Sequence, residues 1–154
     1  MLNPYASFLG SLDPLPVIAA TPGVLREVVA GLRGAGFLDT PREAGKWSPR
    51  QILSHLADTE IVFAMRLRQT ATQEHHVIQP FDQDAWSAAN PTADPDVSLA
   101  TYSAVRASNV EFIRAQPEAM WDKPVTHPER GTMTFRTIVE TMAGHDLNHL
   151  EQFR

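Results

Sequence analysis

The sequence contains no cysteine. Disulfide bonds, thiolate metal ligands and a cysteine nucleophile are therefore excluded, because each requires a thiol from the chain itself. Any metal site must use nitrogen or oxygen ligands. Any thiol chemistry must use a thiol that arrives on a second substrate.

The chain also has little positive charge and no long apolar run. Its 13 lysines and arginines are outnumbered by 18 acidic residues, and the formal net charge is −5. Because the basic residues are scattered singly, the sequence predicts no nucleic-acid partner. No stretch approaches the 18 apolar residues of a membrane span, and the N-terminus does not resemble a signal peptide. We therefore expect a cytoplasmic protein without a membrane partner.

The composition is that of one folded domain over residues 1–154. Hydrophobic residues make up 43% of the chain and charged residues 20%, which is unlike the composition of disordered chains. The length is sufficient to bury a substantial core.

Apolar residues at helical spacing predict four main helices, near residues 22–33, 49–71, 98–116 and 135–153. Thr21 and Pro22 have the chemistry of a helix start, with an N-cap hydroxyl followed by proline. Ser48 and Gln51 form the pattern of a capping box, and Thr134 can cap the last helix. Two shorter helical stretches are expected near residues 5–12 and 84–89. We find no pattern that predicts a strand or a substantial sheet.

Three histidines carry the functional pattern. His145 and His149 lie four residues apart, so their imidazoles share one face of the last helix with Ile138 and Met142. His55 lies about two turns into the second helix and supplies a third imidazole. Histidines at this spacing also occur without a metal, but buried imidazoles need partners. Three imidazoles with one open position are typical of a catalytic metal site.

One ion can join these histidines only if the start of the second helix meets the end of the fourth. Plain up-down-up-down winding makes these helices parallel and separates the histidines. A long crossover between helices two and three makes them antiparallel, which predicts an all-α, up-down-down-up four-helix bundle. The connection over residues 73–97 can reach roughly 80 Å when extended, enough to cross a bundle.

Motifs in the same order as in one known family extend over nearly the whole chain. They are Thr21-Pro22, Trp47-Ser48-Pro49, His55-Leu56-Ala57-Asp58 with Glu60, Arg66, Phe81-Asp82 with Trp86, His127-Pro128 with Gly131, and Gly144-His145-Asp146 with His149. The chain thereby resembles the DinB-like superfamily of metal-binding four-helix bundles. The resemblance implies that His55, His145 and His149 bind a divalent metal. Three imidazoles suit zinc, nickel, iron or copper, and zinc or nickel is favoured. It also implies a homodimer.

The resemblance further implies a metal-dependent thiol S-transferase. A low-molecular-weight thiol such as bacillithiol, mycothiol or glutathione would bind the metal as thiolate and attack a small electrophilic substrate. Three alternatives stay open: a metal-dependent hydrolase, a non-catalytic metal-binding or stress-associated bundle, and a bundle with a vestigial site.

Other polar residues are weaker candidates for the site. Asp58 has the position to orient a ligand ring as a hydrogen-bond acceptor, although a solvated carboxylate fits equally well. Glu60 and Arg66 are expected in salt bridges. His127 is a candidate for lining the pocket, and Tyr102 is expected to pack in the core. We expect the remaining candidates to be solvated histidines and anchors of the crossover, namely His75 and His76, and Asp82 and Trp86.

Overall fold

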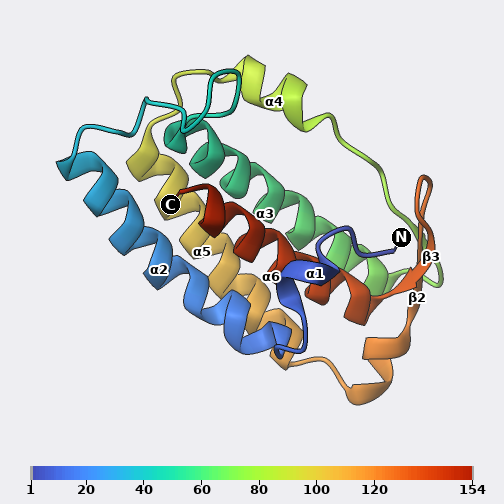
Figure 1. Ribbon diagram of the computed structural model, residues 1–154. Helices are drawn as coiled ribbons and strands as arrows, with labels where there is room; N and C mark the ends of the chain where they lie inside the picture. The colour runs from blue at the N-terminus through green and yellow to red at the C-terminus, as the bar shows by residue number, and fades with distance from the viewer. Residues whose placement is uncertain (1, 154) are drawn as a thin grey trace.

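A computed structural model describes residues 2–153 and shows a mainly α-helical bundle (Figure 1). The four long helices are α2 (Pro14–Gly34), α3 (Pro49–Thr72), α5 (Pro95–Arg114) and α6 (Phe135–Gln152). The shorter elements are α1 (Ala6–Leu9), α4 (Gln83–Ala89), a 3-10 helix (Glu118–Asp122), β1 (His76–Val77), β2 (Pro124–His127) and β3 (Gly131–Thr134). The predicted helical fold class is therefore confirmed at the level of a mainly helical bundle.

Side-chain caps set the starts of α3 and α6 where the sequence predicts them. The Ser48 hydroxyl accepts the backbone N–H of Gln51 at 3.4 Å, and the Gln51 side-chain oxygen accepts the N–H of Ser48 at 2.9 Å. Thr134 accepts the N–H of Thr137 at 3.3 Å in the same way. These bonds satisfy N–H groups that have no partner within the helix.

The first long helix begins at Pro14, so the predicted start at Pro22 is wrong. Asp13 is the actual N-cap, and its side chain accepts the backbone N–H of Leu15 at 3.0 Å. Thr21 does not cap this helix, because its hydroxyl donates to the carbonyl of Val17 one turn earlier. The local chemistry of a helix start therefore occurs here inside a helix.

Pro22 is tolerated inside α2 because another helix compensates for it. A proline lacks the N–H that would bond the carbonyl four residues earlier, which here belongs to Ile18. Arg106 of α5 donates to that carbonyl at 3.0 Å instead. The compensation lies 88 residues away in the sequence, and local spacing does not reveal it.

The earlier start also changes how apolar this helix is. Among the described helices, α2 alone is long and apolar enough to cross a membrane by length and composition, with a mean hydropathy of 1.4 over 18 residues. Its apolar residues do not form one continuous run, because Arg26 and Glu27 interrupt them. Core helices of soluble proteins and N-terminal signal sequences meet the same criterion. Ile18, Leu25 and Val29 of α2 are buried in the bundle, and 22% of the apolar window is buried in all.

Contacts at two levels show that α3 and α5 run parallel. At the start of α3, Arg50 donates to the carbonyl of Ala93, just before α5, at 3.0 Å. Near the end of α3, Arg68 donates to Asn109, late in α5, at 2.7 Å. The connection between the two helices therefore returns along the length of the bundle, and it carries α4 (Figure 1).

Helix α6 runs antiparallel to α3. His55, near the start of α3, meets His145, near the end of α6, with 3.0 Å between their Nε2 atoms. At the other end, Lys123 precedes α6 and donates to the carbonyl of Ala71 at 3.0 Å. The start of α3 therefore lies beside the end of α6, as a shared ion requires.

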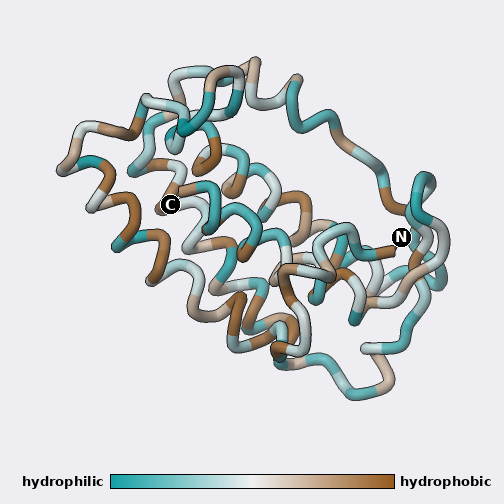
Figure 2. The backbone as a smooth tube through the Cα atoms, in the orientation of Figure 1, coloured by the Kyte–Doolittle hydropathy of each residue, from teal (hydrophilic) through white to brown (hydrophobic). Residues whose placement is uncertain are grey.

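A small three-stranded sheet, which the sequence does not predict, closes one end of the bundle. Its order is β1-β2-β3, with β1 parallel and β3 antiparallel to β2. The strands have two or four residues, too few for an alternating pattern to show. Val125 and Met133 are buried, whereas the tip of the β2–β3 hairpin is hydrophilic (Figure 2).

A buried ion cluster joins all four long helices. Arg106 of α5 donates to Glu60 of α3 at 2.7 Å, to both carboxylate oxygens of Asp146 of α6, and to Ile18 of α2. Asn109 donates to the second carboxylate oxygen of Glu60 at 2.6 Å. The charged side chains are at most 2% exposed. The cluster therefore holds one side chain or carbonyl from each helix in a fixed place.

Replacing Arg106 with alanine should destabilise the fold strongly. The change leaves Glu60 and Asp146 buried without a counter-ion, which costs about 3–5 kcal/mol. Urea and thermal unfolding measure this loss. Arg33→Ala is the control, because it removes an exposed bridge to Asp96 and should cost less than about 1 kcal/mol. Equal losses in the two variants would contradict the special role of the buried cluster.

Candidate metal centre

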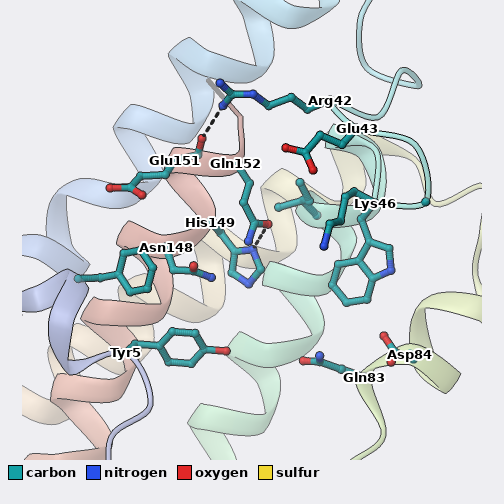
Figure 3. A pocket seen from close by; sticks show the side chains of 14 residues that line it. Tyr5, Arg42, Glu43, Lys46, Gln83, Asp84, Asn148, His149, Glu151 and Gln152 are labelled. Carbon is teal, nitrogen blue, oxygen red and sulfur yellow. Dashed lines mark hydrogen bonds between the residues drawn. The ribbon is translucent and has the colours of Figure 1, made fainter.

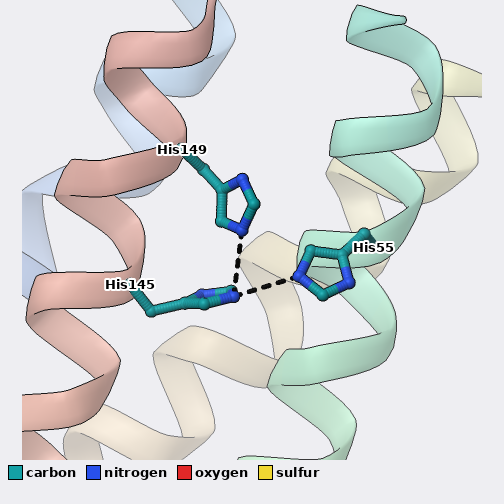
Figure 4. Close-up of side chains that lie close together, drawn as sticks. All are labelled: His55, His145 and His149. Carbon is teal, nitrogen blue, oxygen red and sulfur yellow. Dashed lines mark hydrogen bonds between the residues drawn. The ribbon is translucent and has the colours of Figure 1, made fainter. Parts of the chain in front are cut away.

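Three histidines from two helices converge on one point (Figure 4). The Nε2 atom of His145 lies 3.0 Å from Nε2 of His55 and 3.1 Å from Nε2 of His149. All three side chains are buried, at 4–5% exposure. The structure therefore brings together the three residues that the sequence predicts as ligands.

Hydrogen bonds among the rings do not account for this arrangement. His149 Nδ1 lies 2.9 Å from the side-chain oxygen of Gln152. That oxygen only accepts, so Nδ1 carries the proton and Nε2 of His149 has a lone pair. Nε2 of His145 must then carry a proton and donate it to Nε2 of His149. A protonated Nε2 has no lone pair that could accept a hydrogen bond from His55. One short contact stays without a hydrogen bond, whereas an ion bound to three lone pairs satisfies every ring.

The spacing of the nitrogens also fits a metal. Nitrogens at about 2.0–2.1 Å from a tetrahedral ion lie about 3.3–3.4 Å apart. Two of the three separations in the cluster, 3.0 and 3.1 Å, are close to this value, and all three lie within 4.8 Å. The donor set and its spacing are therefore suited to a divalent ion with an open position.

Burial keeps the three imidazoles neutral, which is the form that binds metals. Burial lowers the pKa of His55 to about 3, and the nearby His149 adds to this effect. Burial also holds the pKa of His145 well below its usual value. The pKa of His149 is lowered by burial, although the hydrogen bond to Gln152 and the charge of Asp146 oppose this.

The groups that orient the ligand rings differ from the sequence expectation. Asp58 is half-buried, and among residues 2–153 no hydrogen bond joins it to a histidine. Gln152 orients His149 instead. Thr59 Oγ1 lies 3.4 Å from both ring nitrogens of His55, so it does not select one of them. The position of Gln152 could have been recognised, because residues three apart share a helix face.

The N-terminal segment forms one wall of the site, which the sequence did not predict. Tyr5 packs edge-to-face against His145, with 5.2 Å between the ring centres. Gly144 allows this approach, because a Cβ atom there would lie 2.5 Å from the Tyr5 carbonyl oxygen. Trp47 packs against His55, with ring centres 4.9 Å apart. A glycine within a helix, beside a predicted ligand, was the available sign of this close contact.

Two cavities meet at the histidines. The larger, of about 590 Å³, opens onto His149 and is lined by several charged and polar side chains (Figure 3). The smaller, of about 310 Å³, opens onto His55 and His145. Tyr5 and Gln83 line both cavities, and Figure 3 shows their side chains pointing toward each other. The site therefore has two approaches from its surroundings.

The weaker candidates separate into three groups. Glu60 forms the predicted salt bridge with Arg106, and Tyr102 packs in the core, where the Arg106 guanidinium lies 4.7 Å from its ring centre. Arg66 does not form the predicted salt bridge with any carboxylate in the described chain. His127 lines the smaller cavity, as expected.

The remaining candidates lie outside the histidine cluster. His75 is exposed as expected, but His76 is buried, because β1 pairs it with Val125 of β2. Asp82 caps α4 by accepting two backbone N–H groups. Trp86 packs on the preceding loop of the crossover and is 42% exposed.

Comparison with known families agrees with the helical fold and the histidine motifs. Residues 18–153 match the family model described as the DinB superfamily. The chain belongs to this superfamily. The resemblance seen in the sequence motifs is therefore confirmed.

Several relatives have been proposed as metal-dependent hydrolases. YfiT of Bacillus subtilis is 30% identical over 136 residues, which cover 82% of this chain and 76% of YfiT. A relative from Oceanobacillus iheyensis is 28% identical, over 84% of this chain and 75% of its own length. The solved structure of YfiT, described as having an unusual four-helix bundle topology, matches 91% of this chain and 81% of YfiT with a TM-score of 0.84 and 26% identity.

Metal-free protein should lose stability in acid between about pH 6.5 and pH 3. Histidine in the unfolded chain titrates near about 6.5, whereas burial lowers the pKa of His55 to about 3 in the fold. Below pH 6.5 the unfolded chain binds protons that the folded chain excludes. The free energy of unfolding should therefore fall by about 1.4 kcal/mol per pH unit for each such histidine.

Urea unfolding at a series of pH values measures this slope. His55→Gln removes one buried imidazole and leaves the carboxylates unchanged, so its slope should be shallower than that of the wild type. Identical slopes in the two proteins would show that His55 does not resist protonation in the fold.

Proposed function

We propose that the protein is a metal-dependent enzyme in which His55, His145 and His149 hold a divalent ion, with zinc or nickel favoured. The convergence of three buried Nε2 atoms beside two cavities carries this proposal. A bound ion would supply Lewis acidity and an open position for a nucleophile or a substrate. The relatives proposed as metal-dependent hydrolases support the metal dependence.

We infer that hydrolysis of a small molecule is the first candidate reaction. The hydrolase descriptions of two relatives, YfiT and the Oceanobacillus iheyensis protein, support this choice. The larger cavity, of about 590 Å³, has the size of a small-molecule site. Hydrolysis is the alternative that the sequence left open beside thiol transfer.

The protein's own residues would orient the ligands and the substrate. Gln152 keeps the proton of His149 on Nδ1, which leaves Nε2 free to bind. Burial raises the pKa of Tyr5, so its hydroxyl stays protonated at neutral pH and donates a hydrogen bond to a substrate at the junction of the cavities. Trp47 and Phe63 lie against the histidine rings and exclude water from them.

Thiol S-transfer is a second candidate, supported by the presence of two cavities. A transfer reaction needs room for two reactants, and the cavities of about 590 and 310 Å³ open onto different histidines of one cluster. The chain has no cysteine, so the thiol would be a low-molecular-weight compound in one cavity. The electrophile would occupy the other.

The proposal includes the up-down-down-up winding and the assembly expected from the sequence. The parallel pair α3 and α5 and the antiparallel pair α3 and α6 support that winding, which brings His55 to the end of α6. A homodimer and a cytoplasmic location are also part of the proposal.

Untagged wild-type protein should retain a divalent metal through purification, whereas His149→Ala should retain much less. The variant keeps two ligands and loses the third, so its affinity falls. Elemental analysis after identical purification measures the occupancy, and a polyhistidine tag is avoided because it can scavenge nickel. His75→Ala, which removes an exposed histidine outside the cluster, should bind like the wild type. Equal occupancy in wild type and His149→Ala would exclude His149 as a ligand.

Two assays on metal-stripped and zinc- or nickel-reloaded protein distinguish the candidate reactions. Cleavage of 4-nitrophenyl acetate that returns with metal and is absent in His149→Ala is expected for a hydrolase. Conjugation of glutathione to 1-chloro-2,4-dinitrobenzene with the same metal dependence is expected for a transferase. Loaded protein that is inactive in both assays, and in a wider panel of esters, amides and thiols, would favour non-catalytic metal binding.

A further inference from the structure

We propose that the smaller cavity is an oxyanion subsite, which selects substrates that carry a carboxylate, phosphate or sulfonate group beside the metal centre. Three cationic or N–H donor side chains, Arg66, Arg130 and His127, line this cavity together with His55 and His145. The inference rests on the proposed function, because it names the substrate class of the same site.

Arg66 is a buried guanidinium for which the described part of the chain supplies no counter-ion. Its side chain belongs to a residue that is 9% exposed, and its Nε atom has no hydrogen-bond partner. One Nη atom reaches the carbonyl of Gln79 at 3.5 Å, which is long for a hydrogen bond. Within residues 2–153 no carboxylate forms a salt bridge with it. A buried charge is costly unless it is paired, so this guanidinium is suited to an anionic ligand.

The β2–β3 hairpin adds two further donors to the same cavity, His127 at the end of β2 and Arg130 in the turn. His127 Nδ1 accepts the backbone N–H of Glu129 at 3.2 Å, so the neutral ring carries its proton on Nε2. Arg130 is close enough that its charge, after the larger effect of burial, contributes to lowering the pKa of Arg66 to about 10. Arg66 is therefore still charged at neutral pH. Glu129 is the one carboxylate among the described lining residues, and it is exposed.

The buried Arg106 shows what Arg66 lacks. Both guanidiniums lie in the interior, but Arg106 is neutralised by Glu60 and Asp146 of its own chain. Arg66 faces a cavity of about 310 Å³ instead. A planar guanidinium binds carboxylate and phosphate through paired hydrogen bonds. An anionic group held there would place the rest of a small molecule against the histidine cluster.

Titration of metal-free protein with inorganic phosphate at low ionic strength tests the subsite, because without metal the histidines are neutral and do not attract the anion. Calorimetry should detect phosphate and acetate, but not the neutral acetamide, binding to the wild type. Arg66→Gln should bind phosphate at least about tenfold more weakly, since it removes a charged hydrogen-bond donor. Arg130 lies in a turn, so Arg130→Gln should leave the core folded. This variant should weaken phosphate binding about threefold.

Arg114→Gln is the matched control, because it makes the same charge change at an exposed position at the end of α5. It should bind phosphate like the wild type. No binding by the wild type, equal binding by folded Arg66→Gln, or an equal loss in Arg114→Gln would overturn the inference. If Arg66→Gln does not fold, unchanged binding by Arg130→Gln overturns it.

Metal content measured on the same preparations before stripping separates this inference from the proposed function. Protein that retains metal but binds no anion contradicts the subsite alone. Protein that binds the anion through Arg66 but never retains metal contradicts the metal centre alone.

Discussion

The rest of the bundle depends on the ion pairs and hydrogen bonds of the buried Arg106 guanidinium. It contacts Ile18 of α2, Glu60 of α3 and Asp146 of α6, so it fixes the level of each helix relative to α5. Asp146 directly follows His145 in the sequence. The register that places the carboxylate beside Arg106 therefore also places the histidines of α6 opposite α3. Folding and the metal centre share this one constraint.

The histidine cluster and the ion cluster are both buried, but their side chains differ in charge. Arg106 is charged and is neutralised inside the protein by two carboxylates. The histidines are neutral because burial lowers their pKa values, and their lone pairs converge without protons to separate them. Arg66 is a third case, a buried charge that forms no salt bridge with the described residues 2–153. The smaller cavity is thus lined both by histidines suited to a cation, His55 and His145, and by an arginine suited to an anion, Arg66.

The long helices supply the three clustered histidines, but elements outside them shape the space around the site. Tyr5 comes from the N-terminal segment, Gln83 from the crossover helix α4, and His127 from the small sheet. These segments are short and lie at the periphery of the bundle (Figure 1). Changes in these peripheral segments can therefore alter the shape of the site while the bundle stays the same.

The sequence alone determined the features that depend on neighbouring residues. The capping box at Ser48, the cap at Thr134 and the shared helix face of His145 and His149 involve contacts within one or two turns, so spacing is sufficient to predict them. The tertiary structure decided which distant groups compensate one another. Pro22 is accommodated inside α2 because Arg106 of α5 donates to the carbonyl of Ile18, which Pro22 cannot do. No carboxylate of the described chain pairs with Arg66, so the expected salt bridge does not form. Such partners lie tens of residues away in the sequence, so the spacing of neighbouring residues does not predict them.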